Sequence, residues 1–313
     1  MLKIPSMKAR VCLSGEEMSR DELSELLAFA EWVKQNRNNP ELRKALEGQS
    51  LALLFEKPSL RTRFSFAVAM HELGGLAVDC LTSSTKKEEP EDTIRVLAGY
   101  CQGVVLRTHE HTNLERMASK NVVPVINGLS DSHHPCQALA DLLTLRQSFG
   151  KLEGLKLAYI GDGNNMLHSL LLLAPFMGVE VRYACPEGYE PNAFIVKRAH
   201  ARAKQGKGSI EANLSPEQAV RGADAVYTDV WTSMGFEDQG QDRDAAFQGF
   251  QVNEELFSHA SPQAIVLHCL SMVRGKEITD GVADHARSAL FRQSENRLHA
   301  QKALLCSLLS KEA

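Results

Sequence analysis

The sequence predicts an α/β protein with two doubly wound, parallel-sheet domains. Short apolar runs alternate with helix-forming segments along the chain, and this alternation favours parallel sheets covered by helices on both faces. The length of 313 residues exceeds what one hydrophobic core usually fills, so two domains are expected. The polar segment SFGKLEG, residues 148–154, lies near the middle of the chain. We place the domain junction there, which gives domains over residues 1–148 and 149–291, followed by a C-terminal segment.

Seven apolar runs are predicted to be strands. They are SLALLFE (50–56), GVVLRT (103–108), VVPVING (122–128), LKLAYIGDG (155–163), VEVRYACP (179–186), DAVYTDVW (224–231) and AIVLHCL (264–270). The clearest helix is expected within residues 14–35, which carry capping residues and helical periodicity, and FAVAMHELGG (66–75) predicts a helix closed by glycine. The charged segment SSTKKEEPED, residues 83–92, is predicted to be a mobile or interface loop.

Composition indicates an ordinary globular protein. The net charge of -4 gives no support for nucleic-acid or membrane partners. The N-terminus MLKIPSMKAR lacks the apolar core of a signal peptide, and the longest apolar stretch, residues 170–179, is too short to cross a bilayer. Seven cysteines without a CxxC pair favour reduced thiols and a cytoplasmic protein.

The segment FEKPSLRTRFSF, residues 55–66, predicts a phosphate site. It joins a strand end to a helix start, where free backbone N–H groups favour an anion. Ser59 and Thr62 add hydroxyl donors, and Arg61 adds a planar guanidinium that can grip two oxygens. The alternative is a capped helix with surface arginines.

The segment DSHHPCQALADLL, residues 131–143, predicts a second cluster at a helix start. His134 and Gln137 are three residues apart and can both donate to a carbonyl oxygen. A zinc site would use His133, His134 and Cys136, but their spacing fits no common zinc pattern.

Three later segments also carry candidate polar groups. The turn YIGDGNNMLHSLL, residues 159–171, is a weak dinucleotide signal because Met166 replaces the third glycine of GxGxxG. Asn164 and Asn165 fit better as amide ligands or helix caps. Asp229 follows a strand in TDVWTSMG and is placed to bind an ammonium group, or else it caps a helix. His268 and Cys269 end another predicted strand.

These motifs together resemble the aspartate and ornithine transcarbamylases. FEKPSLRTRFSF resembles their carbamoyl-phosphate signature, HHPCQALADLL their His-Pro-x-Gln signature, and DVWTSMG the amino-acid signature of the ornithine members. HCL and ENRLHAQKA match the closing segments. The matches occur in the family's order from about residue 50 to residue 305.

The resemblance implies transfer of a carbamoyl group from carbamoyl phosphate to the δ-amine of ornithine, without a metal or another cofactor. It implies an active site in an interdomain cleft, a final helix (about 292–313) that returns to the first domain, and assembly as trimers or assemblies of trimers. Carbamoyl phosphate would be bound by Ser59, Leu60, Arg61, Thr62, Arg107, His134, Gln137 and Arg297. Ornithine would be bound by Asn165, Asp229, Ser233, Met234, Cys269 and Leu270. The residues expected at the reacting groups are Arg107, His134, Cys269 and Arg297.

The chain departs from the family in three places. Leu60 stands where threonine is frequent, with little expected effect because the backbone makes the contact. Ser83 stands near a glutamine that reaches into a neighbouring subunit, and Lys86 or Lys87 would supply a cation to the phosphate instead. Ser271 replaces the proline of His-Cys-Leu-Pro, which leaves either a cis bond before a non-proline residue or a rebuilt loop, beside Met272 and Val273.

Two further activities remain as alternatives. The Ser271 departure is compatible with a carbamoyltransferase for another amine, such as an acylated ornithine or a diamine, although DVWTSMG disfavours it. A nicotinamide-dependent dehydrogenase would use the GDGNN turn, but the third glycine and the acidic residue after the next strand are missing.

Overall fold

The computed structural model describes residues 2–81, 88–232 and 240–310, and the chain forms two compact units. The first unit comprises Met1–Leu143 and Glu295–Ala313, and the second comprises Thr144–Ser294. Two helices continue from one unit into the other. Helix α5 (Pro135–Phe149) begins in the first unit, whereas α12 (Leu290–Leu309) begins in the second and ends in the first.

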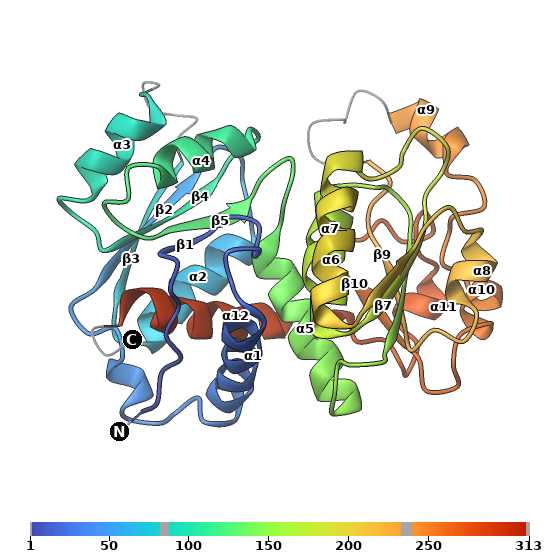
Figure 1. Ribbon diagram of the computed structural model, residues 1–313, viewed down its shortest axis with the longest axis horizontal. Coiled ribbons are helices and arrows are strands. Elements are labelled where there is room, and N and C mark those ends of the chain that lie inside the picture. The colour runs from blue at the N-terminus through green and yellow to red at the C-terminus, as the bar shows by residue number, and fades with distance from the viewer. Residues whose placement is uncertain (1, 82–87, 233–239, 311–313) are drawn as a thin grey trace. The chain divides into compact units, whose positions relative to one another are not determined.

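Within the described residues, the first unit holds a five-stranded parallel sheet of order β1-β5-β4-β2-β3 (Figure 1). Its strands are β1 (Val11–Cys12), β2 (Ser50–Phe55), β3 (Leu76–Leu81), β4 (Gly103–Arg107) and β5 (Val125–Leu129). Its helices, besides those shared with the second unit, are α1 (Arg20–Gln35), α2 (Arg61–Glu72), α3 (Pro90–Leu97) and α4 (His111–Ala118).

Helices cover both faces of this sheet. Figure 1 shows α3 and α4 on one side, and α1, α2 and α12 on the other. On the first side Ala52 and Leu54 of β2 belong to one apolar cluster with Ile94 of α3 and Leu114 of α4. Leu51, Leu53 and Phe55, which alternate with them, are buried too. Interior strand β2 is therefore apolar on both faces, which explains why it is a continuous apolar run in the sequence.

Helix α1 shows why local sequence is enough to start a helix. Ser19 accepts a hydrogen bond from the backbone N–H of Glu22, and the Glu22 side chain accepts from the Ser19 N–H, so both orphan donors are satisfied. The buried face of α1 then carries leucines at helical spacing.

The second unit also holds a five-stranded parallel sheet in its described part, with order β10-β9-β6-β7-β8. Its strands are β6 (Lys156–Ile160), β7 (Glu180–Ala184), β8 (Ser209–Glu211), β9 (Ala225–Thr228) and β10 (Ile265–His268). Its helices are α6 (Asn165–Leu173), α7 (Ala193–Gly206), α8 (Pro216–Val220), α9 (Gly240–Ala246), α10 (Glu254–Ser258) and α11 (Asp280–Ala283). In Figure 1, α6 and α7 lie on one side of the sheet and α8, α10 and α11 lie on the other.

The predicted α/β class and all seven predicted strands are confirmed. They correspond to β2, β4, β5, β6, β7, β9 and β10. One prediction is partly wrong: residues 90–92 are not loop, because Pro90 opens α3 at a position where a missing N–H costs nothing. Residues 83–87 of that segment lie outside the described residues. Among the helices of the described chain, none is both long and apolar enough for a membrane span.

Candidate functional site

In the first unit, the carboxyl ends of β2 and β4 bring Ser59 and Arg107 together. The two strands are neighbours, and Phe55 at the end of β2 is in register with Arg107. The loop after β2 then carries Ser59 over the end of β4, where Arg107 Nη1 donates to Ser59 Oγ across 3.0 Å. This edge of a parallel sheet is where α/β proteins bind ligands.

Arg297 joins the same cluster from α12. It is 2% exposed, its Nη2 donates to Thr62 Oγ1 at 2.7 Å, and its Nη1 donates to Gln137 Oε1 at 2.7 Å. Thr62 lies in the first turn of α2 and Gln137 in the first turn of α5. The two helix starts and the arginine therefore converge within one unit.

The positive charge gathered here perturbs two side chains. Burial, together with the nearby charges of Arg297 and Arg61, lowers the pKa of Arg107 to about 10. Burial and the charges of Arg297, Arg107 and Arg61 also lower the pKa of His134 well below its usual range. His134 is therefore neutral at pH 7. Because the arginines repel one another, an anionic ligand would stabilise the cluster.

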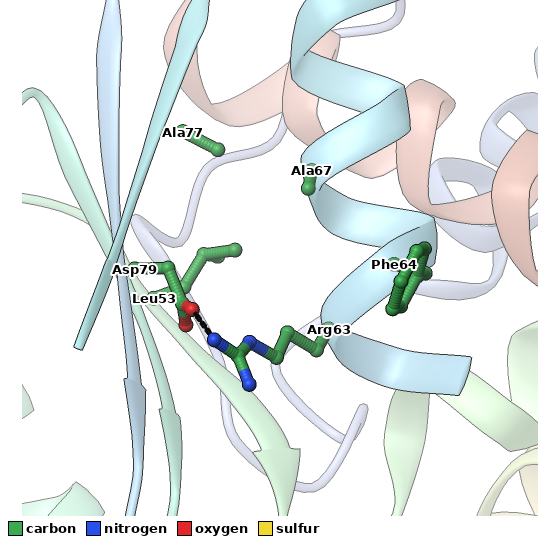
Figure 2. A pocket seen from close by; sticks show the side chains of 6 residues that line it. All are labelled: Leu53, Arg63, Phe64, Ala67, Ala77 and Asp79. Carbon is green, nitrogen blue, oxygen red and sulfur yellow. Dashed lines mark ion pairs between the residues drawn. The ribbon is translucent and has the colours of Figure 1, made fainter. Parts of the chain in front are cut away.

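The basic residues of FEKPSLRTRFSF do not act as one group. Arg63 turns away to form an ion pair with Asp79 of β3, and both line a separate cavity with Leu53, Phe64, Ala67 and Ala77 (Figure 2). Leu60 is the N-cap residue of α2. It is 68% exposed, and its side chain makes no capping hydrogen bond. At this position the chain offers backbone rather than side-chain polarity.

In the second unit, the ends of β6, β9 and β10 bring three polar side chains together. Asn164 Nδ2 donates to Asp229 Oδ2 at 2.8 Å, and Cys269 Sγ donates to Asp229 Oδ1 at 2.9 Å. Asn164 is also the N-cap of α6, accepting from the N–H groups of Met166 and Leu167, which is one of the two roles considered for it from the sequence. Asn165 is the first residue of that helix.

The turn after β10 is braced by a buried histidine and glutamate. His268 Nδ1 accepts from the Leu270 N–H at 2.9 Å, so its proton lies on Nε2, which is 3.0 Å from Glu277 Oε1. Glu277 Oε1 also accepts from the Val273 N–H at 2.6 Å. The Leu270–Ser271 peptide is cis, which is the first of the two alternatives left open by the sequence.

Some predicted site residues cannot be placed. Ser233, Met234, Ser83, Lys86 and Lys87 lie outside the described residues.

Metal-ligating groups gather in one place in the described part of the chain. Donor atoms of Asp229, His268 and Cys269 all lie within 4.8 Å of one another. Both ring nitrogens of His268 already take part in hydrogen bonds, to Leu270 and Glu277. The zinc set weighed from the sequence, which included His133 and Cys136, is not such a group among the described residues.

The GDGNN turn has a structural explanation that needs no dinucleotide. A side chain at Gly163 would lie 2.2 Å from the Pro191 backbone nitrogen, so close packing requires glycine there. Asp162 Oδ2 accepts from Arg243 Nη1 at 2.8 Å, in a buried ion pair.

Comparison with known proteins gives a consistent result over both units. Residues 10–147 match the model of the aspartate/ornithine carbamoyltransferase carbamoyl-P binding domain, and residues 153–308 match that of the Asp/Orn binding domain. The chain belongs to the aspartate/ornithine carbamoyltransferase family.

Individual members of this family align over almost their whole length. The ornithine carbamoyltransferase of Anoxybacillus flavithermus is 47% identical over 306 residues, which cover 97% of this chain and 98% of the relative. That of Thermococcus kodakarensis is 44% identical over 309 residues, covering 98% of each. The solved structure of ornithine carbamoyltransferase from Pyrococcus furiosus superposes with a TM-score of 0.92 at 41% identity, covering 98% of this chain and 99% of that one.

Membership of this family makes the protein a transferase. Its candidate site residues fall into two groups. In the first unit Arg107 is hydrogen-bonded to Ser59, and Arg297 is hydrogen-bonded to both Thr62 and Gln137. Asp229 and Cys269 are connected in the second. The sequence did not point to Glu277, Arg243 or Asp141 as residues that support these groups; for Asp141 the available signal was its position four residues after Gln137 on one helix face.

Proposed function

We infer that this protein transfers the carbamoyl group of carbamoyl phosphate to the δ-amine of L-ornithine, giving L-citrulline and phosphate. The observation that carries this inference is the near-complete alignment with relatives named ornithine carbamoyltransferase at 44 to 47% identity. An acylated ornithine or a diamine as acceptor is not favoured.

We propose that the first unit binds carbamoyl phosphate. Ser59, Leu60, Arg61 and Thr62 would surround the phosphate, with backbone N–H groups at the start of α2 adding to the field. Arg107, His134, Gln137 and Arg297 would contact the carbamoyl group. Burial, followed by the charges of Arg297 and Arg61, lowers the pKa of Arg107, and the gathered positive charge supports an anionic ligand.

The second unit would bind ornithine. Asp229 is 7% exposed and accepts from Asn164 and Cys269, which supports a carboxylate held ready for an ammonium group. Asn165, Ser233 and Met234 would complete the amino-acid pocket, and Cys269 and Leu270 would lie beside the reacting amine.

The proposed chemistry needs orientation and electrostatic stabilisation. The neutral δ-amine attacks the carbonyl carbon, and negative charge develops on the carbonyl oxygen. Arg107, Arg297 and neutral His134 are preorganised donors for that oxygen. Phosphate then leaves, with Arg61 and the start of α2 balancing its charge. Bringing two oriented substrates together can contribute up to about 7–11 kcal/mol.

Three further properties belong to the same proposal. We propose a homotrimer or an assembly of trimers, a cytoplasmic location supported by the seven free thiols, and a role in arginine metabolism. We also propose that Lys86 or Lys87 supplies a cation to the phosphate. Replacing both by alanine should raise the KM for carbamoyl phosphate, and an unchanged KM would refute this assignment.

The direct test is product stoichiometry. Purified protein given carbamoyl phosphate and L-ornithine should form citrulline and inorganic phosphate in equal amounts. Phosphate release that exceeds citrulline many-fold, at saturating ornithine and after correction for spontaneous hydrolysis, would contradict the proposed transfer.

A further inference from the structure

A buried carboxylate in α5 lies behind the Arg297 cluster. Asp141 is 0% exposed, and its Oδ1 accepts from Gln137 Nε2 at 2.9 Å, one helical turn earlier. The other end of the Gln137 amide, Oε1, accepts from Arg297 Nη1 at 2.7 Å. Gln137 is itself 1% exposed, so its amide is confined between these two neighbours.

The two neighbours fix which way the amide points. The Oδ1 atom of Asp141 accepts a hydrogen bond here, and a guanidinium only donates them. The Gln137 amide must therefore turn its NH2 to Asp141 and its oxygen to Arg297. With the amide reversed, NH2 would face the guanidinium and oxygen would face the carboxylate, and both contacts would be repulsive.

The donor-to-acceptor direction of these hydrogen bonds also determines how the Thr62 hydroxyl is used. Because Arg297 Nη2 donates to Thr62 Oγ1 at 2.7 Å, the hydroxyl of Thr62 is used as an acceptor on that side. Its own hydrogen is left to donate elsewhere. Four side chains from α5, α12 and α2 thus form one directed chain, with the acceptor end at Asp141 and a hydroxyl donor at the start of α2.

We propose that Asp141 is a positioning residue for carbamoyl phosphate: it fixes the Gln137 amide, which holds the Arg297 guanidinium and, through it, the Thr62 hydroxyl. This role rests on the proposed function only in that Gln137, Arg297 and Thr62 contact carbamoyl phosphate. Asp141 itself need not touch the ligand.

The experiment measures carbamoyl phosphate affinity directly, by titration calorimetry, together with the KM for carbamoyl phosphate. Asp141→Leu removes the acceptor, frees the amide to turn and should weaken binding 10- to 100-fold. Asp141→Asn keeps an oxygen acceptor of the same shape and should weaken binding by less than about 5-fold. Leu142→Ala, a core truncation on the same helix, should lower the melting temperature without changing affinity.

A pair of variants separates positioning from general stability. Gln137→Glu places a second carboxylate against Asp141 and should lose at least about 100-fold in affinity. Adding Asp141→Asn supplies an NH2 to the new carboxylate, which still accepts from Arg297. The double variant should recover at least about 10-fold of the lost affinity, and the recovery is partial because the amide that contacts the carbamoyl group is still missing. No recovery at all in a folded double variant, or an unchanged affinity in Asp141→Leu, would overturn the proposal.

The calorimetric measurement also separates the Asp141 proposal from the ornithine assignment. Calorimetry with carbamoyl phosphate alone does not depend on the acceptor amine. If the wild type binds carbamoyl phosphate but forms no citrulline, the ornithine assignment fails, and the affinities of the Asp141 variants still decide the positioning role.

Discussion

Arg297 and Thr62 are 235 residues apart in the sequence, yet Arg297 Nη2 donates to Thr62 Oγ1 across 2.7 Å. The contact exists because α12 ends in the first unit, where Arg297 and Lys302 reach Thr62 and Glu72 of α2. Helix α12 therefore supplies a buried cation to the start of α2, which lies within the predicted phosphate segment 55–66.

Replacing Arg297 by lysine should strongly lower the catalytic efficiency, kcat/KM. A lysine carries the charge on one nitrogen and cannot hold Gln137 and Thr62 at once as the planar guanidinium does. Steady-state kinetics of Arg297→Lys should give a kcat/KM lowered by about 100- to 1,000-fold. Arg292→Lys, an exposed arginine at the start of the same helix, is the control and should retain full activity. If kcat/KM fell by less than about 5-fold in Arg297→Lys, the planar guanidinium would not have the proposed role.

Removing the thiol of Cys269 should change the KM for ornithine and leave the KM for carbamoyl phosphate unchanged. Its Sγ donates to Asp229 Oδ1, so Cys269→Ala removes a donor from the carboxylate proposed to bind the amino acid. We expect the KM for ornithine to rise about 10-fold in the alanine variant and less in Cys269→Ser, which keeps a donor. Cys101→Ala, in the core of the first unit, should leave the KM for ornithine unchanged. Equal effects on both substrates would argue against this placement.

Acid should destabilise the fold through His299. Burial, with the charge of Lys34 next in importance, lowers the pKa of His299 to about 4. Below pH 6.5 the unfolded chain takes up a proton that the folded chain refuses, so the free energy of unfolding falls as the pH falls toward 4. The loss between pH 7 and pH 5 from this group is about 2 kcal/mol.

Denaturant unfolding at the two pH values checks this. His299→Gln should remove that part of the pH dependence, while replacing the exposed His259 by glutamine should not. Some dependence should remain, because His134 is also held neutral by burial. An unaltered difference between pH 7 and pH 5 in His299→Gln would rule the histidine out.

The buried ammonium of Lys302 predicts an asymmetry between two substitutions. Lys302 is 0% exposed, and its Nζ lies 2.9 Å from Glu72 Oε2. Glu72→Gln leaves that charge buried without its counter-ion and should cost about 3–5 kcal/mol in the free energy of unfolding. Lys302→Met removes the buried charge, and Glu72 keeps Arg37, so it should cost far less. Thermal or denaturant unfolding of the two variants measures the difference; similar losses would show that the ion pair is not the cause.

The sequence predicts the interior of each sheet and misses most of the edges. The strands that it does not predict are β1, β3 and β8, and all three are edge strands. Strand β3 leaves Leu76 and Val78 largely exposed and includes Asp79, and β8 has three residues, so neither forms a continuous apolar run. Edge strands pair with one neighbour only and are more exposed to solvent. Their sequences therefore show the apolar pattern of a strand less clearly.

Candidate site residues can be proposed from the sequence where they belong to short motifs. Thr62, His134 and Gln137 are candidates of this kind, and the structure places Thr62 and Gln137 against Arg297. Arg297 is ambiguous in the sequence because a mid-helix arginine is usually exposed; only tertiary packing buries it. Asp141 was not predicted, because its proposed role depends on the direction of the Gln137 amide, and that direction is defined only once Arg297 is in place.

The measurement that tests the central claim most directly is acceptor selectivity. The purified chain is assayed with saturating carbamoyl phosphate and each of L-ornithine, N-acetylornithine, putrescine and aspartate, and kcat/KM is determined for each amine. We predict that ornithine is preferred over every other amine by at least about 100-fold. Preferred carbamoylation of another amine would contradict the ornithine assignment and would leave the carbamoyl-phosphate half of the account standing.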